Sequence, residues 1–279
     1  RCNKRTCAFC NREKVSDHKK KVGSVLRQAT RDKKSVVMVT KTIPNVDITA
    51  DSWKILQATD KRMKRNLRRS KDLSVKILRE KIGAEILKKE YTVNFDKPAT
   101  KAYNIHYQNV MIFDKAPSKR DITELNKQWA KAFKAISPKK RINKNAVWTK
   151  TLISEEDYSS LSDEELQNKV TKIVFEISKY VGKDDANLRM SKIVENFKKS
   201  KARAARKGWS DKVKHYQTQI DAIERDPAAA FRKHLESIYA FKGKTILSFS
   251  GKYKPVKIET VKPVFTPKAF TYLEAHNTA

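Results

Sequence analysis

Short strand-like runs set among amphipathic helices constrain the fold of this chain more than any other feature. Ser35–Thr42 is a run of mostly β-branched residues followed closely by Pro44, which predicts a buried strand. Further strands are predicted within 84–95 and over 103–113. The segment 96–100 between them contains an aspartate and a proline, residues typical of turns, so we expect these two strands to pair antiparallel.

Apolar residues that recur every three or four positions predict the helices. Ser162 and Glu165 have the spacing of a capping box, which marks the start of one helix. The segment after Pro227 is expected to form a short helix, followed by a last strand over 245–251. The other predicted helices cover 12–34, 51–70, 121–136, 187–226 and the segment from Ser162 to near Gly182.

The charge of the chain is strongly unbalanced: 63 Lys and Arg face 31 Asp and Glu, a formal net charge of +32. Such a surplus attracts polyanions, either nucleic acid or an anionic membrane surface. The sequence has no apolar run of about 18 residues and no signal-peptide core, so we expect a cytoplasmic protein without a membrane segment. Two cationic runs are candidates for DNA binding: Arg65, Arg68 and Arg69, and then Lys198, Lys199, Lys201, Arg203 and Arg206.

All three cysteines lie within the first ten residues. Cys7 and Cys10 are separated by two residues, so both thiolates can reach one tetrahedral zinc ion. Cys2 can supply a third ligand, and His18 or a residue upstream of Arg1 the fourth. Reduced thiols near a chain end are the simpler alternative. We expect a structural zinc knuckle here.

The segment 104–110 carries polar residues at a spacing that suits metal binding. On a strand, alternate side chains share a face, so His106 and Gln108 are expected to point the same way. An imidazole nitrogen and an amide oxygen can bind one divalent cation, and Glu90 on the preceding predicted strand could add a carboxylate. Such a site suits Mg²⁺ or Mn²⁺. A polar patch on a half-exposed strand is the alternative, and spacing alone favours it.

A second candidate constellation surrounds Tyr180. Glu176 lies four residues before it, hence on the same helix face. A tyrosine phenol can act as a covalent nucleophile, and a carboxylate beside it could activate a water molecule. Lys179 and Lys183 could hold a phosphate or lower the pKa of the phenol. An exposed tyrosine with ordinary helix charge pairs is the alternative.

Taken in order, these motifs resemble the rolling-circle plasmid replication initiators of Gram-positive bacteria, members of the HUH endonuclease superfamily. Residues 40–45 (Thr-Lys-Thr-Ile-Pro-Asn) are similar to the first motif of that family. Tyr180 and the residues up to Asp184 are similar to its lysine–tyrosine motif, and 242–251 to its C-terminal strand. Together with the cysteines, Glu90 and the His106-Tyr107-Gln108 segment, the resemblance runs from residue 2 to about 253. The family usually has histidine where this chain has Gln108, although initiators of circular single-stranded DNA viruses also use glutamine.

The resemblance implies an α+β fold in which helices flank a central antiparallel sheet. It also places a nicking domain with DNA-binding helices in 35–255. The cysteine spacing and the basic segment after it indicate a zinc knuckle and a lead-in helix in 1–34, and repeated prolines after Pro255 indicate an irregular tail in 256–279. The resemblance also implies a metal-dependent nickase that starts plasmid replication at an origin, on a single-stranded or hairpin site, with host factors such as a helicase.

The site residues that the resemblance implies divide into two groups. Glu90, His106 and Gln108 would hold Mg²⁺ or Mn²⁺ at the scissile phosphate. Tyr180 would form a 5′-phosphotyrosine, Glu176 would serve the second step and Lys183 would assist. The alternatives are a relaxase or transposase of the same superfamily, a non-enzymatic zinc-knuckle protein that binds nucleic acid, and a membrane-surface protein.

Overall fold

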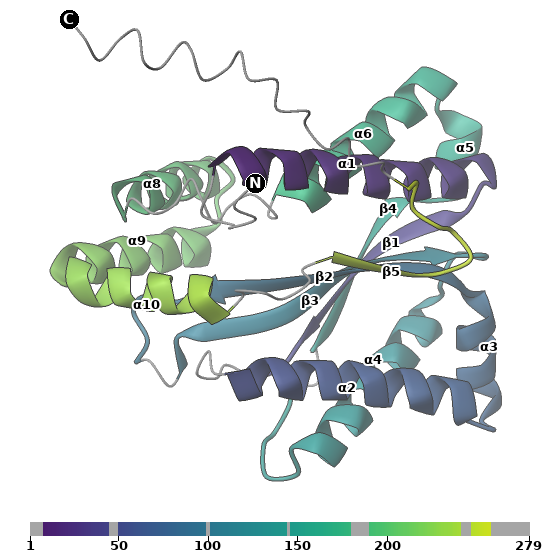
Figure 1. The fold of residues 1–279 in the computed structure, drawn as a ribbon, viewed down its shortest axis with the longest axis horizontal. Coiled ribbons are helices and arrows are strands. Elements are labelled where there is room, and N and C mark those ends of the chain that lie inside the picture. The colour runs from purple at the N-terminus through teal and green to yellow at the C-terminus, as the bar shows by residue number, and fades with distance from the viewer. Residues whose placement is uncertain are drawn as a thin grey trace, which may run out of the picture.

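The structure, a computed structural model, describes residues 8–44, 50–98, 101–143, 146–179, 190–240 and 247–257. Its centre is a five-stranded sheet in the order β4-β1-β3-β2-β5, in which all neighbouring strands are antiparallel. Helices cover both faces of this sheet (Figure 1), so the predicted α+β class is confirmed. The strands are β1 (Ser35–Thr42), β2 (Ile82–Val93), β3 (Tyr103–Phe113), β4 (Val147–Ile153) and β5 (Leu247–Gly251).

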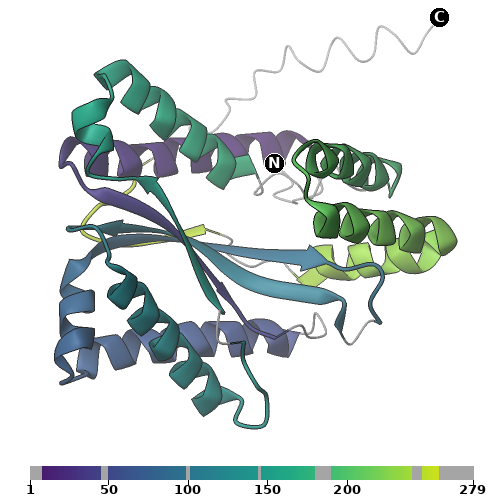
Figure 2. The same ribbon diagram turned by 180° about the vertical axis from the view of Figure 1, so that it is seen from behind.

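One face of the sheet, here called the α2 face, is covered by three helices (Figures 1 and 2). Side chains such as Val39 of β1 and Phe113 of β3 pack there against Trp53 and Trp129 from the helices. These residues form one hydrophobic cluster because alternate side chains of each strand point to the same side. The helices are α2 (Ala50–Arg69), α3 (Leu73–Lys81) and α4 (Lys119–Ile136).

The opposite face, the α1 face, is covered by α1 (Ala8–Arg31) and α6 (Asp163–Lys179), with the short α5 (Asp157–Ser160) leading into α6. Leu26 of α1 and Val170 of α6 belong to the same hydrophobic cluster as Val110 of β3. We expected a domain boundary after residue 34. In the structure, α1 precedes this position and packs into the same hydrophobic core as the sheet strands. The chain after β5 also crosses α1, where Tyr253 donates a hydrogen bond to Asp32 at 2.9 Å.

Three more helices stack beside one end of the sheet and hold the turn between β2 and β3 (Figure 1). Phe95 of this turn packs against Ile193 and Ile223, and its backbone N–H donates to Gln219 Oε1 at 2.7 Å. Lys233 Nζ donates to the Phe95 carbonyl oxygen at 2.9 Å. The three helices are thus anchored to the β2–β3 hairpin. They are α8 (Met190–Arg206), α9 (Ser210–Arg225) and α10 (Pro227–Ala240).

Local signals explain several element boundaries. The capping box predicted at the start of α6 is confirmed, since Glu165 N–H donates to Ser162 Oγ at 3.3 Å and Ser162 N–H to Glu165 Oε2 at 2.9 Å. The charged segment 187–226 divides into α8 and α9 at Gly208, whose φ of +66° suits glycine. Of the helices in the described ranges, none combines the length and the apolar character needed to cross a bilayer.

Candidate functional site

The strand register brings the predicted metal ligands together at one end of the α1 face. Glu90 on β2 lies directly opposite His106 on β3, and Lys88 lies opposite Gln108. Alternation places all four side chains on the face to which Val110 also points. His106 Nε2 lies 3.6 Å from Glu90 Oε2. These two atoms are close enough for one ion to contact both.

The polar surface continues across β1 to the edge strand. Thr42 pairs with His106, and Thr40 pairs with both Gln108 and Trp148 of β4. One position further along the same face, Met38 and Val110 begin the apolar region that α1 and α6 cover. We call this end of the sheet the polar floor; it consists of Thr40, Thr42, Lys88, Glu90, His106, Gln108 and Trp148.

Lys88 is a member of the polar floor that sequence reasoning missed. Its side chain is 1% exposed, and Nζ donates to Gln108 Oε1 at 3.1 Å. The same ammonium lies 3.6 Å from Glu90 Oε2. Lys88 therefore places a positive charge among the residues expected to bind a divalent cation. In the sequence, Lys88 stands two residues before Glu90. On a strand this spacing puts both side chains on one face, so Lys88 could have been predicted as a neighbour of Glu90.

Glu90, His106 and Gln108 carry donor atoms of the kinds that bind Mg²⁺ or Mn²⁺, but the ammonium of Lys88 lies against the oxygens of Glu90 and Gln108 and opposes a cation there. When His106 carries its proton on Nδ1, that atom can donate to the Asn104 carbonyl oxygen at 3.4 Å, which leaves Nε2 free on the Glu90 side. Within the described part of the chain, no three His, Cys, Asp or Glu side chains form a metal-binding group. A third protein ligand would thus be Gln108, whose oxygen Lys88 orients.

The helix that carries Glu176 packs on the same face as the polar floor. Ile177 of α6 is buried in the cluster with Val110, while Glu176 itself is exposed. Tyr180 and Lys183 lie outside the described residues, which end at residue 179 in this region. Their roles as nucleophile and phosphate-binding lysine stay predictions, but α6, which precedes Tyr180 in the sequence, packs on the same side of the sheet as the polar floor.

Other tyrosines are poorly suited to act as nucleophiles. Tyr107 points to the α2 face, where burial and the nearby carboxylates of Asp60 and Glu85 raise its pKa. Tyr103 donates a hydrogen bond to Glu236 Oε2 at 2.7 Å. Burial raises the pKa of Tyr158 to about 12, and its hydroxyl donates to the Lys34 carbonyl oxygen at 2.7 Å. Tyr103 and Tyr158 already donate hydrogen bonds, and the raised pKa values of Tyr107 and Tyr158 disfavour their phenolate forms.

The predicted zinc knuckle is only partly within the described residues. Cys2 and Cys7 lie outside them, and Cys10 lies in the first turns of α1. His18 is eight residues further along the same helix, a rise of about 12 Å. Ligands of one tetrahedral zinc ion lie about 2.0–2.3 Å from the metal. This spacing along one helix gives no support to His18 as the fourth ligand, and the zinc knuckle stays a prediction.

The two predicted DNA-binding runs lie in different parts of the fold. Arg65, Arg68 and Arg69 are exposed on α2, on the opposite side of the sheet from the polar floor. On α8, Arg203 and Arg206 are also exposed. The lysines of α8 have local partners: Lys198 lies 3.5 Å from Glu224, Lys199 pairs with Glu195, and Lys201 donates to Gln217.

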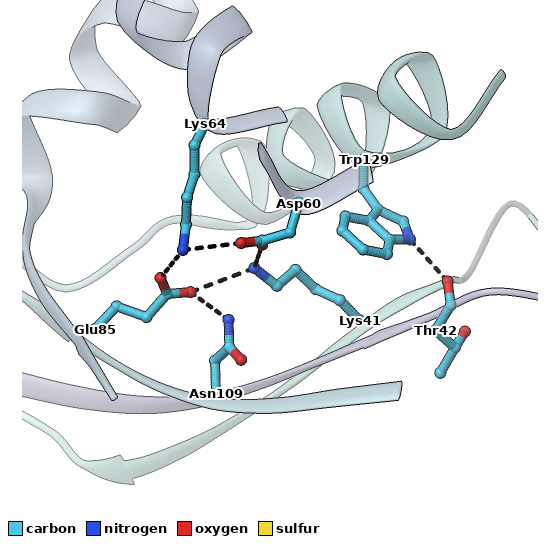
Figure 3. Close-up of polar contacts among 7 residues, drawn as sticks. All are labelled: Lys41, Thr42, Asp60, Lys64, Glu85, Asn109 and Trp129. Atoms are coloured by element: carbon cyan, nitrogen blue, oxygen red, sulfur yellow. Dashed lines mark hydrogen bonds and ion pairs between the residues drawn. The ribbon is translucent and has the colours of Figure 1, made fainter. Parts of the chain in front are cut away.

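A second polar cluster, buried beneath α2, is a structural network (Figure 3). Lys41 Nζ of β1 lies 2.6 Å from Asp60 Oδ1 of α2 and 3.3 Å from Glu85 Oε1 of β2. Lys64 pairs with both carboxylates, and Asn109 of β3 donates to Glu85. Two ammonium groups thus balance two carboxylates. The network ties α2 to the three strands that carry most of the polar floor on their other side.

Comparison of the chain with models of known protein families, with curated proteins and with solved structures finds no match. The geometry of the polar floor and the motifs of the sequence are therefore the features that indicate a function. Three features of that floor could not be assigned in advance: Lys88, the pairing of Thr40 and Thr42 with the predicted ligands, and Trp148 on a strand that sequence reasoning did not predict.

Proposed function

We propose that this chain is a sequence-specific DNA nickase that initiates rolling-circle replication of a plasmid in the cytoplasm. The observation that carries the proposal is the pairing of Glu90 with His106 across neighbouring strands, beside Gln108. The helix leading to Tyr180 packs on the same face of the sheet. The resemblance to HUH endonucleases supports the same activity, since it rests on these residues in this order.

The polar floor provides the groups that would bind the scissile phosphate. Glu90, His106 and Gln108 would hold Mg²⁺ or Mn²⁺, which supplies Lewis-acid chemistry at the phosphate. Lys88 keeps the Gln108 oxygen in place and adds positive charge where a phosphodiester brings negative charge. The Asn104 carbonyl fixes the ring of His106. These residues would position the substrate. The nucleophile that breaks the phosphodiester bond must come from outside the polar floor.

Tyr180 is the proposed nucleophile. Its phenolic oxygen would attack the scissile phosphorus, and the bond from phosphorus to the 3′ oxygen would break. The leaving oxygen takes a proton and becomes the 3′ hydroxyl that primes synthesis, while the protein stays linked to the 5′ phosphate. Lys183 would favour the phenolate by its charge. Glu176 would later deprotonate a water molecule or a second nucleophile, which releases the tyrosine.

The test is covalent capture. The protein is incubated with Mn²⁺ and a pool of random single-stranded oligonucleotides, and adducts that survive denaturation are isolated. Sequencing the attached strands would give the recognised site, and mass spectrometry should find the phosphate on Tyr180. Tyr180→Phe removes only the phenolic oxygen and serves as the matched control. Absence of adduct with the wild-type chain, or equal adduct with Tyr180→Phe, would refute the proposed chemistry.

A non-enzymatic nucleic-acid-binding protein is the second candidate, favoured by the exposed Arg203 and Arg206 on α8 and by the net charge of +32. It predicts salt-dependent DNA binding without any adduct in the same assay. A relaxase or transposase of the same superfamily would give the adduct. The position of the captured sequence separates these enzymes from a replication initiator. An initiator that works with a helicase should capture a replication origin, whereas a relaxase or transposase should capture a transfer origin or a transposon end.

A further inference from the structure

The four tryptophans of the chain occupy different environments. Trp53 and Trp129 are buried, with exposed fractions of 1% and 0%. Trp209 lies in the turn between α8 and α9, where Lys212 Nζ and Lys207 Nζ lie 3.9 Å and 4.8 Å from its ring centroid. Trp148 is the most exposed of the four, at 54%. Its indole is the one large aromatic surface of the polar floor.

The register fixes the distance between Trp148 and the proposed catalytic groups. Trp148 pairs with Thr40, which pairs with Gln108 on the next strand. Neighbouring strands lie about 4.8 Å apart, so the backbones of Trp148 and Gln108 are about 10 Å apart. His106 lies one same-face position further along β3, about 7 Å from Gln108. Extended single-stranded DNA covers such a separation with about one or two nucleotides.

The chemistry around Trp148 suits a nucleobase attached to a phosphate backbone. Lys150 follows on the same face of β4, two residues along, and is exposed. β4 is an edge strand, so Trp148 has a neighbouring strand on one side only, and 54% of the residue is exposed. Trp209, in contrast, already has two ammonium groups over its ring. An exposed aromatic ring beside cations is the arrangement with which proteins hold unpaired bases by stacking.

We propose that Trp148 is a base-stacking residue that holds a nucleobase of single-stranded DNA next to the scissile phosphate on the polar floor. This subsite rests on the proposed nicking function, because that function defines which phosphate lies at His106. Stacking requires an unpaired base. The subsite therefore selects single-stranded or hairpin-loop DNA over duplex, and it would fix the register of the strand relative to the metal ligands.

Because the four tryptophans differ in exposure, their fluorescence can report where single-stranded DNA binds. Titration with an oligothymidylate in the presence of a chelator, which blocks nicking, should quench the fluorescence of Trp148. The quenching should disappear in Trp148→Phe, which keeps a ring but loses the indole signal, and should persist in Trp209→Phe. Trp148→Ala should weaken binding of single-stranded DNA about tenfold and change duplex binding little. Trp209→Ala is the matched control and should bind like the wild type.

Several results would overturn the subsite. Quenching that persists in Trp148→Phe and vanishes in Trp209→Phe would move the contact to the α8–α9 turn. Wild-type affinity in Trp148→Ala, with a normal circular dichroism spectrum, would exclude stacking at this residue. A change in oligomeric state without a change in DNA affinity would assign the indole to a protein contact. If the wild type forms covalent adduct and Trp148→Ala does so equally at low DNA concentration, only the subsite fails; if the wild type forms none, the nicking proposal itself fails.

Discussion

Replacing Lys41 with methionine should destabilise the fold strongly, because it removes one cation from a buried balanced network. The side chain of Lys41 is fully buried, and those of Asp60 and Glu85 are 8% and 6% exposed. Methionine has a similar length and fills the same space, so the packing is largely kept. The two carboxylates would then share the single ammonium of Lys64, which is partly exposed.

The magnitude follows from the distances. Separations of 2.6 Å and 3.3 Å to Asp60 and Glu85 correspond to attractions of about 6 and 5 kcal/mol at an effective dielectric constant of about 20. Desolvation of the buried ammonium cancels several kcal/mol of this gain. Breaking a buried pair by removing one partner costs about 3–5 kcal/mol, and we expect a loss of that size in the free energy of unfolding.

Urea denaturation followed by circular dichroism at neutral pH measures this loss. Lys61→Met is the matched control, because Lys61 is an exposed lysine on α2, the helix that carries Asp60 and Lys64, and should change the stability by less than about 0.5 kcal/mol. A Lys41→Met variant within about 1 kcal/mol of the wild type would refute the reasoning, since it would mean that the carboxylates need no buried cation.

The same network gives the sign of a pH effect. Burial raises the pKa of Asp60, but the ammonium groups of Lys41 and Lys64 outweigh it and hold the pKa below its ordinary value of 3.8. A carboxylate with a lowered folded-state pKa stabilises the fold above its unfolded pKa, and this contribution is lost as the pH falls through the folded value. Wild-type stability should therefore drop below about pH 4, and the drop should be smaller in Lys41→Met.

The remaining predictions concern the polar floor and DNA. His106→Ala should abolish nicking and keep most DNA affinity, because phosphate contacts dominate binding; gel shift and nicking assays on one preparation separate the two. Lys88→Met should tighten Mn²⁺ binding at least about tenfold, because it removes an ammonium group 3.6 Å from Glu90 Oε2 that repels the ion. Calorimetric titration without DNA measures this affinity, and an unchanged value would contradict the prediction. Glu176→Ala should still form the covalent adduct but release product about 10²–10⁴-fold more slowly, because a general base is lost. A time course on denaturing gels measures both steps. If Glu176 serves the first step instead, the variant would form no adduct. DNA affinity should fall steeply with salt concentration, and a flat response would remove the electrostatic argument.

Strong local patterns made much of the sheet predictable. The predicted bounds of β1 and β3 agree with the structure, because both strands are long β-branched or apolar runs between turn residues. β4 was missed because it is an edge strand in which only Val147 and Ile153 are buried, so its apolar pattern is weak. α3 was missed because it is short and buries only Val75 and Leu78.

The candidate site was predictable as a set of residues but not as a geometry. Alternation alone places His106 and Gln108 on one face, whereas the pairing of Glu90 with His106 depends on the register set by the hairpin. Lys88 was overlooked because a fully buried lysine is rare, although its spacing of two residues from Glu90 places both side chains on one face of β2. The separation of the α2 cations from the polar floor likewise depends on which helix covers which face.

Alternation along β1 and β3 also has a genetic consequence. Lys41 and Tyr107 point into the α2 face, whereas Thr40 and His106 line the polar floor. Adjacent codons would therefore give different kinds of mutant allele. Changes at 41 or 107 lower the amount of folded protein, so they should be recessive and temperature-sensitive. Under the proposed nicking function, changes at 40 or 106 would leave a folded chain that occupies its DNA target without cutting it, so these alleles should be dominant over the wild type.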